Sequence, residues 1–322
     1  MTQYKAMVVE QHGQTPVWTD RDVTAPEAGQ LRIKVACCAL NFADLLMIKG
    51  SYQETPPLPF VPGMEVAGEV MEVGDGVTGF AVGQRITSFC GSGGLAEQLV
   101  VSEDRCMAIP DTMDDVIAAA FPIAYGTSHL GLTRRARLTA GETLVVLGAA
   151  GGVGLTAVEI GKALGARVIA VARGAEKLAV AKGAGADVVL DAQMDDLRGA
   201  LKEAGPIDVV YDPVGSALGE AALRSLAPEG RYLVIGFASG DIPNLRANHL
   251  LVKNIDVIGF YWGGYRHFAP AQLTGSLAEL MTWIAEGRIT PHVSNVLKIA
   301  ELDDALEMLR QRKATGKVVL TL

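Results

Sequence analysis

The stretch Leu144–Gly154 reads LVVLGAAGGVG, an apolar run that ends in glycine-dense backbone. Its first four residues predict a strand, and Leu155–Leu164 continue at helical spacing directly after the glycines. Glycine lets the chain turn tightly and approach phosphate groups, and the following helix directs its free N–H groups toward them. The spacing Gly-x-Gly-x-x-Gly is present as Ala149, Gly151 and Gly154, with alanine in first place. This turn predicts a dinucleotide pyrophosphate site, and the alternative is an ordinary strand-to-helix turn. The residues assigned to the site are Ala150, Gly151, Gly152, Val153 and Gly154.

The end of the next predicted strand, Arg167–Val171, selects the form of the cofactor. A carboxylate here would accept hydrogen bonds from the ribose 2′-hydroxyl of NAD. The chain instead has Arg173, with Lys177 one helical turn on, and no carboxylate before Glu176. Because a guanidinium pairs bidentately with phosphate oxygens, these two cations favour the 2′-phosphate of NADPH. The alternative is a pair of solvated cations at the start of a helix.

Composition bounds the class of protein. A length of 322 residues with 49% hydrophobic and 20% charged residues predicts a soluble globular protein of two domains. The net charge of −8, without any run of Lys or Arg, argues against a nucleic-acid partner. No apolar segment approaches the roughly 20 residues of a membrane span, and the N-terminus lacks a signal-peptide core. We therefore expect a cytoplasmic protein whose four cysteines, which form no CxxC pair, are reduced and structural.

The order of elements predicts an α/β protein. Up to about residue 120 the chain is β-rich, with short apolar strands at Ala6–Val9, Leu31–Ala36 and Val66–Val73 between Gly/Pro turns. From Gly141 onward strands alternate with amphipathic helices, which is typical of a doubly wound parallel sheet. Its six predicted strands are Leu144–Leu147, Arg167–Val171, Val188–Leu190, Ile207–Asp212, Arg231–Ile235 and Ile255–Gly259. After the helices Leu273–Glu286 and Glu301–Gln311, a last strand, Lys317–Leu322, is expected to return to the N-terminal sheet, because a closing strand needs a partner.

Five segments along the whole chain carry a family resemblance: NFADLLMIKGSYQ at Asn41–Gln53, FVPGMEVAGEV at Phe60–Val70, VGDGVTGFAVGQRI at Val73–Ile86, LGAAGGVG at Leu147–Gly154 and TGKVVL at Thr315–Leu320. Together they resemble the medium-chain dehydrogenase/reductase superfamily, and within it the zinc-independent quinone oxidoreductases. The resemblance implies a GroES-like catalytic domain from residues 1–122 and 262–322 and a Rossmann domain over 123–261, with the active site in the cleft.

Two departures from the superfamily pattern concern the metal and the cofactor. Zinc alcohol dehydrogenases carry Cys where this chain has Asn41 and His where it has Met64, and an amide and a thioether cannot replace those ligands. The four-cysteine lobe of a structural zinc is also missing, so we expect no zinc. Quinone oxidoreductases often place Tyr or His on the 2′-phosphate where this chain has Ala192, which leaves that phosphate to Arg173 and Lys177.

The resemblance places three candidate catalytic residues near the acceptor. Asn41 can donate to a carbonyl oxygen, and Asp44 either orients Asn41 and the backbone or caps a helix. Tyr52 either donates to the substrate oxygen or packs as a half-buried side chain. Met64 is expected to be apolar lining of the substrate site, and Glu65 to be structural.

Further cofactor contacts are implied by the resemblance and by position at the carboxyl ends of strands. Aromatic core packing is the alternative for Tyr261 and Trp262, and a solvated amine is the alternative for Lys317. His129 is expected to be an ordinary packed histidine. The assigned cofactor contacts are Thr127, Gly236, Phe237, Ala238, Tyr261, Trp262 and Lys317.

These observations predict hydride transfer from NADPH to a quinone or enone, whose delocalised phenolate or enolate needs no Lewis acid. An enoyl-thioester or alkenal reductase is an alternative, although no cationic patch for coenzyme A phosphates is evident from the sequence. An NADPH-binding protein with little turnover is another. We also expect a homodimer that pairs through the apolar edge strand Ile255–Phe260. Asp256 in this strand is an argument against the homodimer, because a charge on an edge strand prevents pairing.

Overall fold

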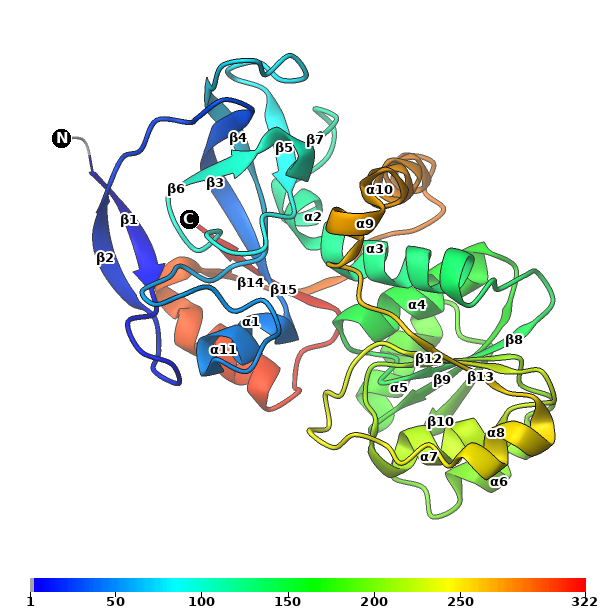
Figure 1. Ribbon diagram of the computed structural model, residues 1–322. Coiled ribbons are helices and arrows are strands. Elements are labelled where there is room, and N and C mark those ends of the chain that lie inside the picture. The colour runs from blue at the N-terminus through cyan, green and yellow to red at the C-terminus, as the bar shows by residue number, and fades with distance from the viewer. Residues whose placement is uncertain (1–2) are drawn as a thin grey trace. The chain divides into compact units, whose positions relative to one another are not determined.

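The computed structural model describes residues 3–322 and divides into two compact units (Figure 1). The first unit takes the chain up to Ile123 together with His292–Leu322, and the second is Ala124–Pro291. The first is built on antiparallel strands and the second on a parallel sheet with helices between its strands. The expected α/β fold class is thereby confirmed.

The first unit is organised around its longest strand, β3 (Gln30–Leu40), which pairs with β4 (Glu65–Val73) along one side. On its other side the first half of β3 pairs with β6 and the second half with β15. Leu31, Ile33 and Val35 alternate into the core, because successive side chains of a strand point to opposite faces. The remaining strands and helices are β1 (Gln3–Val8), β2 (Val17–Asp22), α1 (Phe42–Lys49), β5 (Arg85–Ser88), β6 (Gln98–Ser102), β7 (Cys106–Ala108), α2 (Asp115–Ala120), β14 (Val293–Lys298), α11 (Leu302–Arg310) and β15 (Lys317–Thr321).

The second unit is a doubly wound sheet. Its six parallel strands lie in the order β10-β9-β8-β11-β12-β13, so the chain reverses direction across the sheet beside β8 (Thr143–Leu147). All five residues of β8 are buried, as expected for a central strand covered by helices on both faces. The other strands are β9 (Arg167–Ala172), β10 (Val188–Asp191), β11 (Val209–Asp212), β12 (Arg231–Val234) and β13 (Asp256–Gly259). The helices are α3 (Pro122–Leu130), α4 (Gly152–Ala163), α5 (Ala175–Gly183), α6 (Leu197–Glu203), α7 (Ser216–Ser225), α8 (Ala247–Lys253), α9 (Tyr265–Phe268) and α10 (Pro270–Ala285).

The second boundary between the units differs from the one expected from the sequence. Residues 262–291, which we expected in the GroES-like domain, belong to the second unit. The reason is the partner of α10: His129 Nδ1 lies 2.8 Å from Ser276 Oγ, and the His129 ring meets the Trp283 ring edge-on at 5.1 Å. The apolar face of α10 is buried here, and His129 is the packed histidine that we expected. Burial lowers the pKa of His129, and Glu279 opposes this shift.

The chain re-enters the first unit through β14, and β15 pairs with β3, so the return of the last strand is confirmed. The four cysteines are free and buried. Within residues 3–322, no helix has the length and apolar character needed to cross a membrane.

Candidate functional site

The glycine-rich turn joins β8 to α4. Gly148 has a φ of +60°, and the backbone N–H of Gly151 donates to the Gly148 carbonyl at 2.9 Å. Gly154 lies so close to this turn that a Cβ on it would stand 2.1 Å from the Gly148 oxygen. Gly151, the residue before α4, has no such obstacle, since its Cβ would meet the same oxygen at 3.4 Å. No side chain caps α4, so its first-turn N–H groups and the positive end of its dipole are available to an anion.

A chain of buried hydroxyl groups lies beneath the turn, and the sequence analysis did not find it. Ser128 Oγ lies 2.7 Å from Thr156 Oγ1 and 2.9 Å from the hydroxyl of Tyr211, which is fully buried on β11. The Ser128 and Thr156 oxygens also lie 3.0 and 2.9 Å from the carbonyl oxygen of Val153, which can accept from one of the two hydroxyls. These contacts join α3, α4 and β11 and hold the first turn of α4 in place.

The end of β9 carries the two predicted phosphate contacts. Arg173 follows the strand and is exposed, Gly174 has a φ of +79°, and Lys177 is half-buried in the first turn of α5. The N–H of Ala192 donates to the Ala172 carbonyl at 2.9 Å, so the chain after β10 runs beside this turn. The alanine methyl there offers no polar group to a phosphate.

Asp212, at the carboxyl end of β11, ties the turn that follows it to β12, and the sequence analysis missed this residue. Its Oδ1 accepts the N–H groups of Val214 and Gly215 at 2.7 and 2.8 Å, and its Oδ2 accepts the Tyr232 hydroxyl. Burial raises the pKa of Asp212, and these three donors oppose that shift. The predicted contacts Gly236, Phe237 and Ala238 lie beside this turn, where the Ala238 N–H donates to the Pro213 carbonyl and Phe237 is 40% exposed.

Two predicted cofactor contacts lie mostly buried in the second unit. Trp262 is 7% exposed, and its Nε1 would stand 2.8 Å from a Cβ on Gly126, so the indole packs closely against α3. Thr127, on the same helix, is 8% exposed. Tyr261 is half-buried. The burial of the Trp262 ring favours packing, which was one of the two alternatives from sequence.

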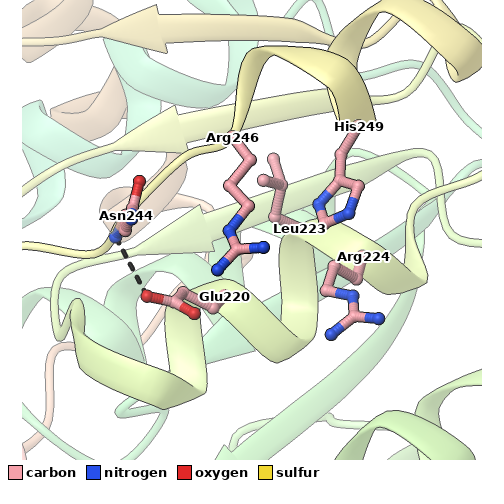
Figure 2. Close-up of a pocket in the computed structure, with 6 residues that line it drawn as sticks. All are labelled: Glu220, Leu223, Arg224, Asn244, Arg246 and His249. Atoms are coloured by element: carbon pink, nitrogen blue, oxygen red, sulfur yellow. Dashed lines mark hydrogen bonds between the residues drawn. The ribbon is translucent and has the colours of Figure 1, made fainter.

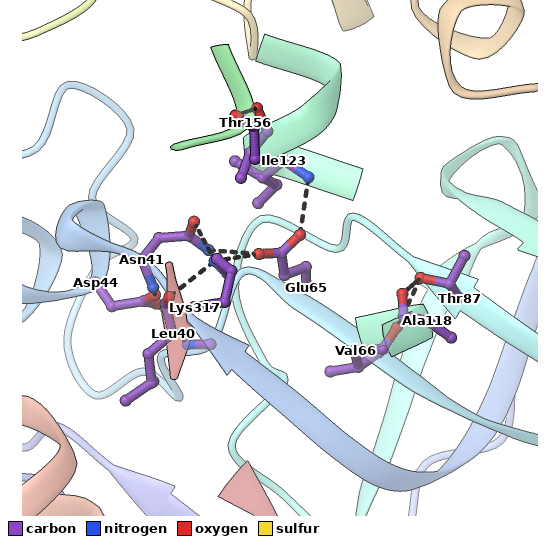
Figure 3. A network of polar contacts seen from close by, with 12 residues as sticks. Leu40, Asn41, Asp44, Glu65, Val66, Thr87, Ala118, Ile123, Thr156 and Lys317 are labelled. Carbon is purple, nitrogen blue, oxygen red and sulfur yellow. Dashed lines mark hydrogen bonds and ion pairs between the residues drawn. The ribbon is translucent and has the colours of Figure 1, made fainter. Parts of the chain in front are cut away.

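A buried polar network in the first unit contains three of the residues that the sequence analysis singled out (Figure 3). Lys317 Nζ donates to Glu65 Oε1 at 2.7 Å, to Asn41 Oδ1 at 2.8 Å and to the Leu40 carbonyl at 2.8 Å. Asn41 Nδ2 donates to the same Glu65 oxygen at 2.9 Å. All three donors of the ammonium are therefore used inside the network, which favours a structural role for Lys317 over a contact to cofactor phosphate.

Asp44 caps α1. Its Oδ2 accepts the Asn41 N–H at 2.8 Å, and its Oδ1 accepts the Gly63 N–H at 3.0 Å. Asp44 is fully buried, and this burial raises its pKa to about 6 against the effect of the two N–H donors. The side chain thus orients the backbone around Asn41, which was the alternative to a catalytic role.

The other two candidates in the first unit pack against its core. Tyr52 is half-buried against the hydrophobic core of the first unit. Met64 is 8% exposed and packs within that core, which favours packing over substrate lining. Glu65 is fully buried, and its second oxygen accepts the N–H of Ile123 at 2.8 Å, in keeping with the expected structural role.

This donor set does not fit a catalytic zinc ion. The Asn41 amide and the Glu65 carboxylate both already bind the Lys317 ammonium, a cation that would repel a second one. Met64 supplies a thioether, which is a poor ligand for Zn²⁺. Among residues 3–322, no three His, Cys, Asp or Glu side chains are grouped so that they could hold a metal ion.

Comparisons with known proteins agree with both units. Residues 27–111 match the family model "Alcohol dehydrogenase GroES-like domain", and residues 152–283 match "Zinc-binding dehydrogenase". Quinone oxidoreductase-like protein 2 of Bos taurus is 40% identical over 301 residues, which are 91% of this chain and 85% of that protein. Acryloyl-coenzyme A reductase of Metallosphaera sedula is 33% identical over 98% of this chain and 99% of its own. The quinone oxidoreductase of Thermus thermophilus, solved also in complex with NADPH, superposes with a TM-score of 0.85 at 33% identity, over 99% of this chain and 100% of its own.

Proposed function

Because the chain belongs to the medium-chain dehydrogenase/reductase superfamily and is quinone oxidoreductase-like, we propose that it transfers hydride from NADPH to a quinone or a related conjugated carbonyl compound without a metal ion. The observation that carries the choice of cofactor is the end of β9. Arg173 and Lys177 stand where an NAD enzyme would need a carboxylate, and Arg173 is exposed. The Thermus thermophilus relative supports this choice, since its structure was solved with NADPH.

The second unit has the features that a dinucleotide requires. The glycine-rich turn and the uncapped N-terminus of α4 would hold the pyrophosphate, with the Gly151 backbone open to close approach. Arg173 and Lys177 would bind the 2′-phosphate, and the loops after β11 and β12 would lie along the remainder of the cofactor. Bound NADPH would supply the hydride.

The chain's own residues would orient the acceptor and stabilise its developing charge. Asn41 uses one amide N–H on Glu65, and the second N–H would donate to the acceptor oxygen. Tyr52 would be a second donor. A quinone or enone suits this metal-free donor set, because the charge delocalises over a phenolate or an enolate and demands less stabilisation than an alkoxide.

Loss of NADPH absorbance in the presence of a panel of quinones, enones and alkyl aldehydes tests the proposal. Turnover with quinones or enones, and none with alkyl aldehydes, is expected. NADPH binding without turnover of any acceptor would favour the alternative of a binding protein, and turnover only with aldehydes would overturn the argument from charge delocalisation.

A reductase of enoyl thioesters is the second candidate, and the observation that favours it is the 33% identity to acryloyl-coenzyme A reductase over nearly the whole chain. An acryloyl thioester belongs in the same panel. A kcat/KM for the thioester well above that for every quinone would select this candidate.

The homodimer remains part of the proposal. Among residues 3–322, β13 pairs with β12 alone and so lies at the edge of the sheet, with Val257 37% exposed. The neighbouring charge of Asp256 lies 3.5 Å from Arg137 Nη2, and this ion pair lessens its repulsion toward a second strand. An apolar edge of this kind can pair with a copy of itself.

A further inference from the structure

A cationic cavity lies on the second unit between α7 and the segment that leads into α8 (Figure 2). Its volume is about 160 Å³. Two guanidinium groups and an imidazole line it, Arg224 from α7 and Arg246 and His249 from the start of α8. The lining residues, which we call the arginine pocket, are Glu220, Leu223, Arg224, Asn244, Arg246 and His249.

The arginine pocket holds two guanidinium groups and one carboxylate, so positive charge is in excess there. In the part of the chain that the structure describes, the guanidinium groups of Arg224 and Arg246 form no ion pair and no hydrogen bond. Of the six lining residues only Glu220 is acidic, and its Oε1 accepts the backbone N–H of Asn244 at 3.0 Å. This excess of positive charge contrasts with the net charge of −8 of the whole chain.

More cations continue this face beyond the cavity. Lys253 Nζ donates to the Arg224 carbonyl at 3.0 Å, which places the end of α8 against the end of α7. The pKa of Lys253 is lowered by burial and then by the charges of Lys202 and Arg198 on α6. Arg198 and Lys202 of α6 therefore lie close enough to Lys253 to act on it electrostatically, and helices α6, α7 and α8 lie together in Figure 1.

The arginine pocket is separate from the glycine-rich turn. That turn follows the carboxyl end of β8. Helix α7 follows the carboxyl end of β11 and runs back toward the amino-terminal ends of the strands. The N–H of Ala227, just after α7, donates to the carbonyl of Ile207, just before β11 begins. Arg224, in the last turn of α7, therefore lies toward the amino-terminal edge of the sheet.

We propose that the arginine pocket binds the phosphate group of a small molecule, at a second site distinct from the cofactor. Guanidinium forks match phosphate oxygens bidentately, and Arg224 and Arg246 approach the cavity from two elements. A cavity of about 10–15 Å³ holds one water molecule, so the 160 Å³ of the arginine pocket accommodates a phosphate group. The group recognised would be a phosphate dianion, either as free inorganic phosphate or as a monoester of an organic molecule.

The test is a calorimetric titration of the full-length protein saturated with NADPH, so that the cofactor's own phosphate sites are filled. Inorganic phosphate and glycerol 3-phosphate are the two probes, at fixed ionic strength. We expect saturable binding of at least one of them at one site per chain. Tighter binding of glycerol 3-phosphate would identify an organic ester as the ligand, and equal binding would identify the phosphate group alone.

Matched variants assign the binding to the pocket. Arg224→Ala and Arg246→Ala are each expected to weaken phosphate binding about tenfold or more, because a charge-assisted hydrogen bond is lost. Arg246→Lys, which keeps the charge but loses the fork, is expected to lie between wild type and Arg246→Ala. The control Arg310→Ala removes an exposed guanidinium from α11 of the first unit and is expected to bind like wild type.

Two results would overturn the proposal. One is the absence of saturable binding of both probes to the wild-type protein. The other is an equal loss of affinity in Arg310→Ala and in the two pocket variants, which would show attraction to surface charge in general. Unchanged NADPH affinity in Arg224→Ala and Arg246→Ala separates this site from the proposed cofactor site.

Discussion

Replacement of Gly154 by alanine tests the glycine-rich turn most directly. A Cβ at this position would stand 2.1 Å from the Gly148 oxygen and 2.7 Å from the Gly148 carbonyl carbon. Both atoms are backbone, so no side-chain rotation can relieve the contact. The turn or the first turn of α4 must move by more than about 1 Å to reach an ordinary van der Waals separation.

The loss of folding stability in Gly154→Ala is that of an overpacked core. Such insertions cost about 1–3 kcal/mol and occasionally more, and a rigid backbone neighbour places Gly154→Ala at about 3 kcal/mol. For a unit of this size each kcal/mol lowers Tm by about 2–4 °C, so the melting temperature is expected to fall by about 6–12 °C. Differential scanning calorimetry, with and without NADPH, measures this change.

Two other glycines supply matched controls. In Gly151→Ala the new Cβ meets only the Gly148 oxygen at 3.4 Å, so stability is expected to change by less than about 1 kcal/mol. The same methyl group faces the proposed pyrophosphate, so NADPH affinity is expected to fall at least about tenfold. Gly183→Ala, at the end of α5 with nothing within 4 Å, is expected to be neutral or slightly stabilising. A Gly154→Ala protein that melts within about 2 °C of wild type would refute the close approach, and unchanged NADPH affinity in Gly151→Ala would refute the location of the pyrophosphate.

Arg173→Ala is expected to weaken NADPH binding by about one to two orders of magnitude and to leave NADH binding almost unchanged, since only NADPH carries the 2′-phosphate; equal losses for both cofactors would assign Arg173 a structural role. Lys317→Met leaves the Glu65 carboxylate buried without its cation and is expected to cost about 3–5 kcal/mol in chemical unfolding. The double variant with Glu65→Gln should recover part of that loss, and a loss below about 1 kcal/mol for Lys317→Met alone would contradict the buried ion pair. Elemental analysis of the purified protein is expected to find no stoichiometric zinc, and activity is expected to persist in a chelator; one zinc ion per chain would contradict the argument from the donor set. Val257→Pro removes a backbone donor from the edge strand and is expected to convert the dimer to a folded monomer in light scattering, whereas a dimer that survives would place the interface elsewhere.

Local patterns predicted the second unit closely, because the forces that form a strand–turn–helix act over a few residues. The apolar run before the glycines is β8, and the helical spacing after them is α4. Arg173 and Lys177 also follow β9 as expected, because the end of the apolar run marks the end of the strand. Residue types alone also showed that Asn41 and Met64 stand where zinc enzymes carry metal ligands.

Contacts between distant segments could not be predicted in the same way. Glu65 and Lys317 are 252 positions apart in the sequence. The residues around each of them do not indicate that the Lys317 ammonium binds a carboxylate on another strand. Ser128 and Tyr211 meet across 83 positions, beneath a turn whose own pattern shows only glycines. These pairs form because buried polar groups must find partners wherever the packing of the elements brings them.

The sequence alone determined the six strands of the second unit along the chain, the position of the glycine-rich turn and the lack of zinc-ligand residue types at positions 41 and 64. The tertiary structure decided that 262–291 belong with the second unit, that the three donors of Lys317 are used internally, and that Arg224 and Arg246 converge on one cavity. The physical reason is that periodicity and turn chemistry depend on adjacent residues, whereas the partner of a helix face or of a buried charge depends on which distant segments share the same core.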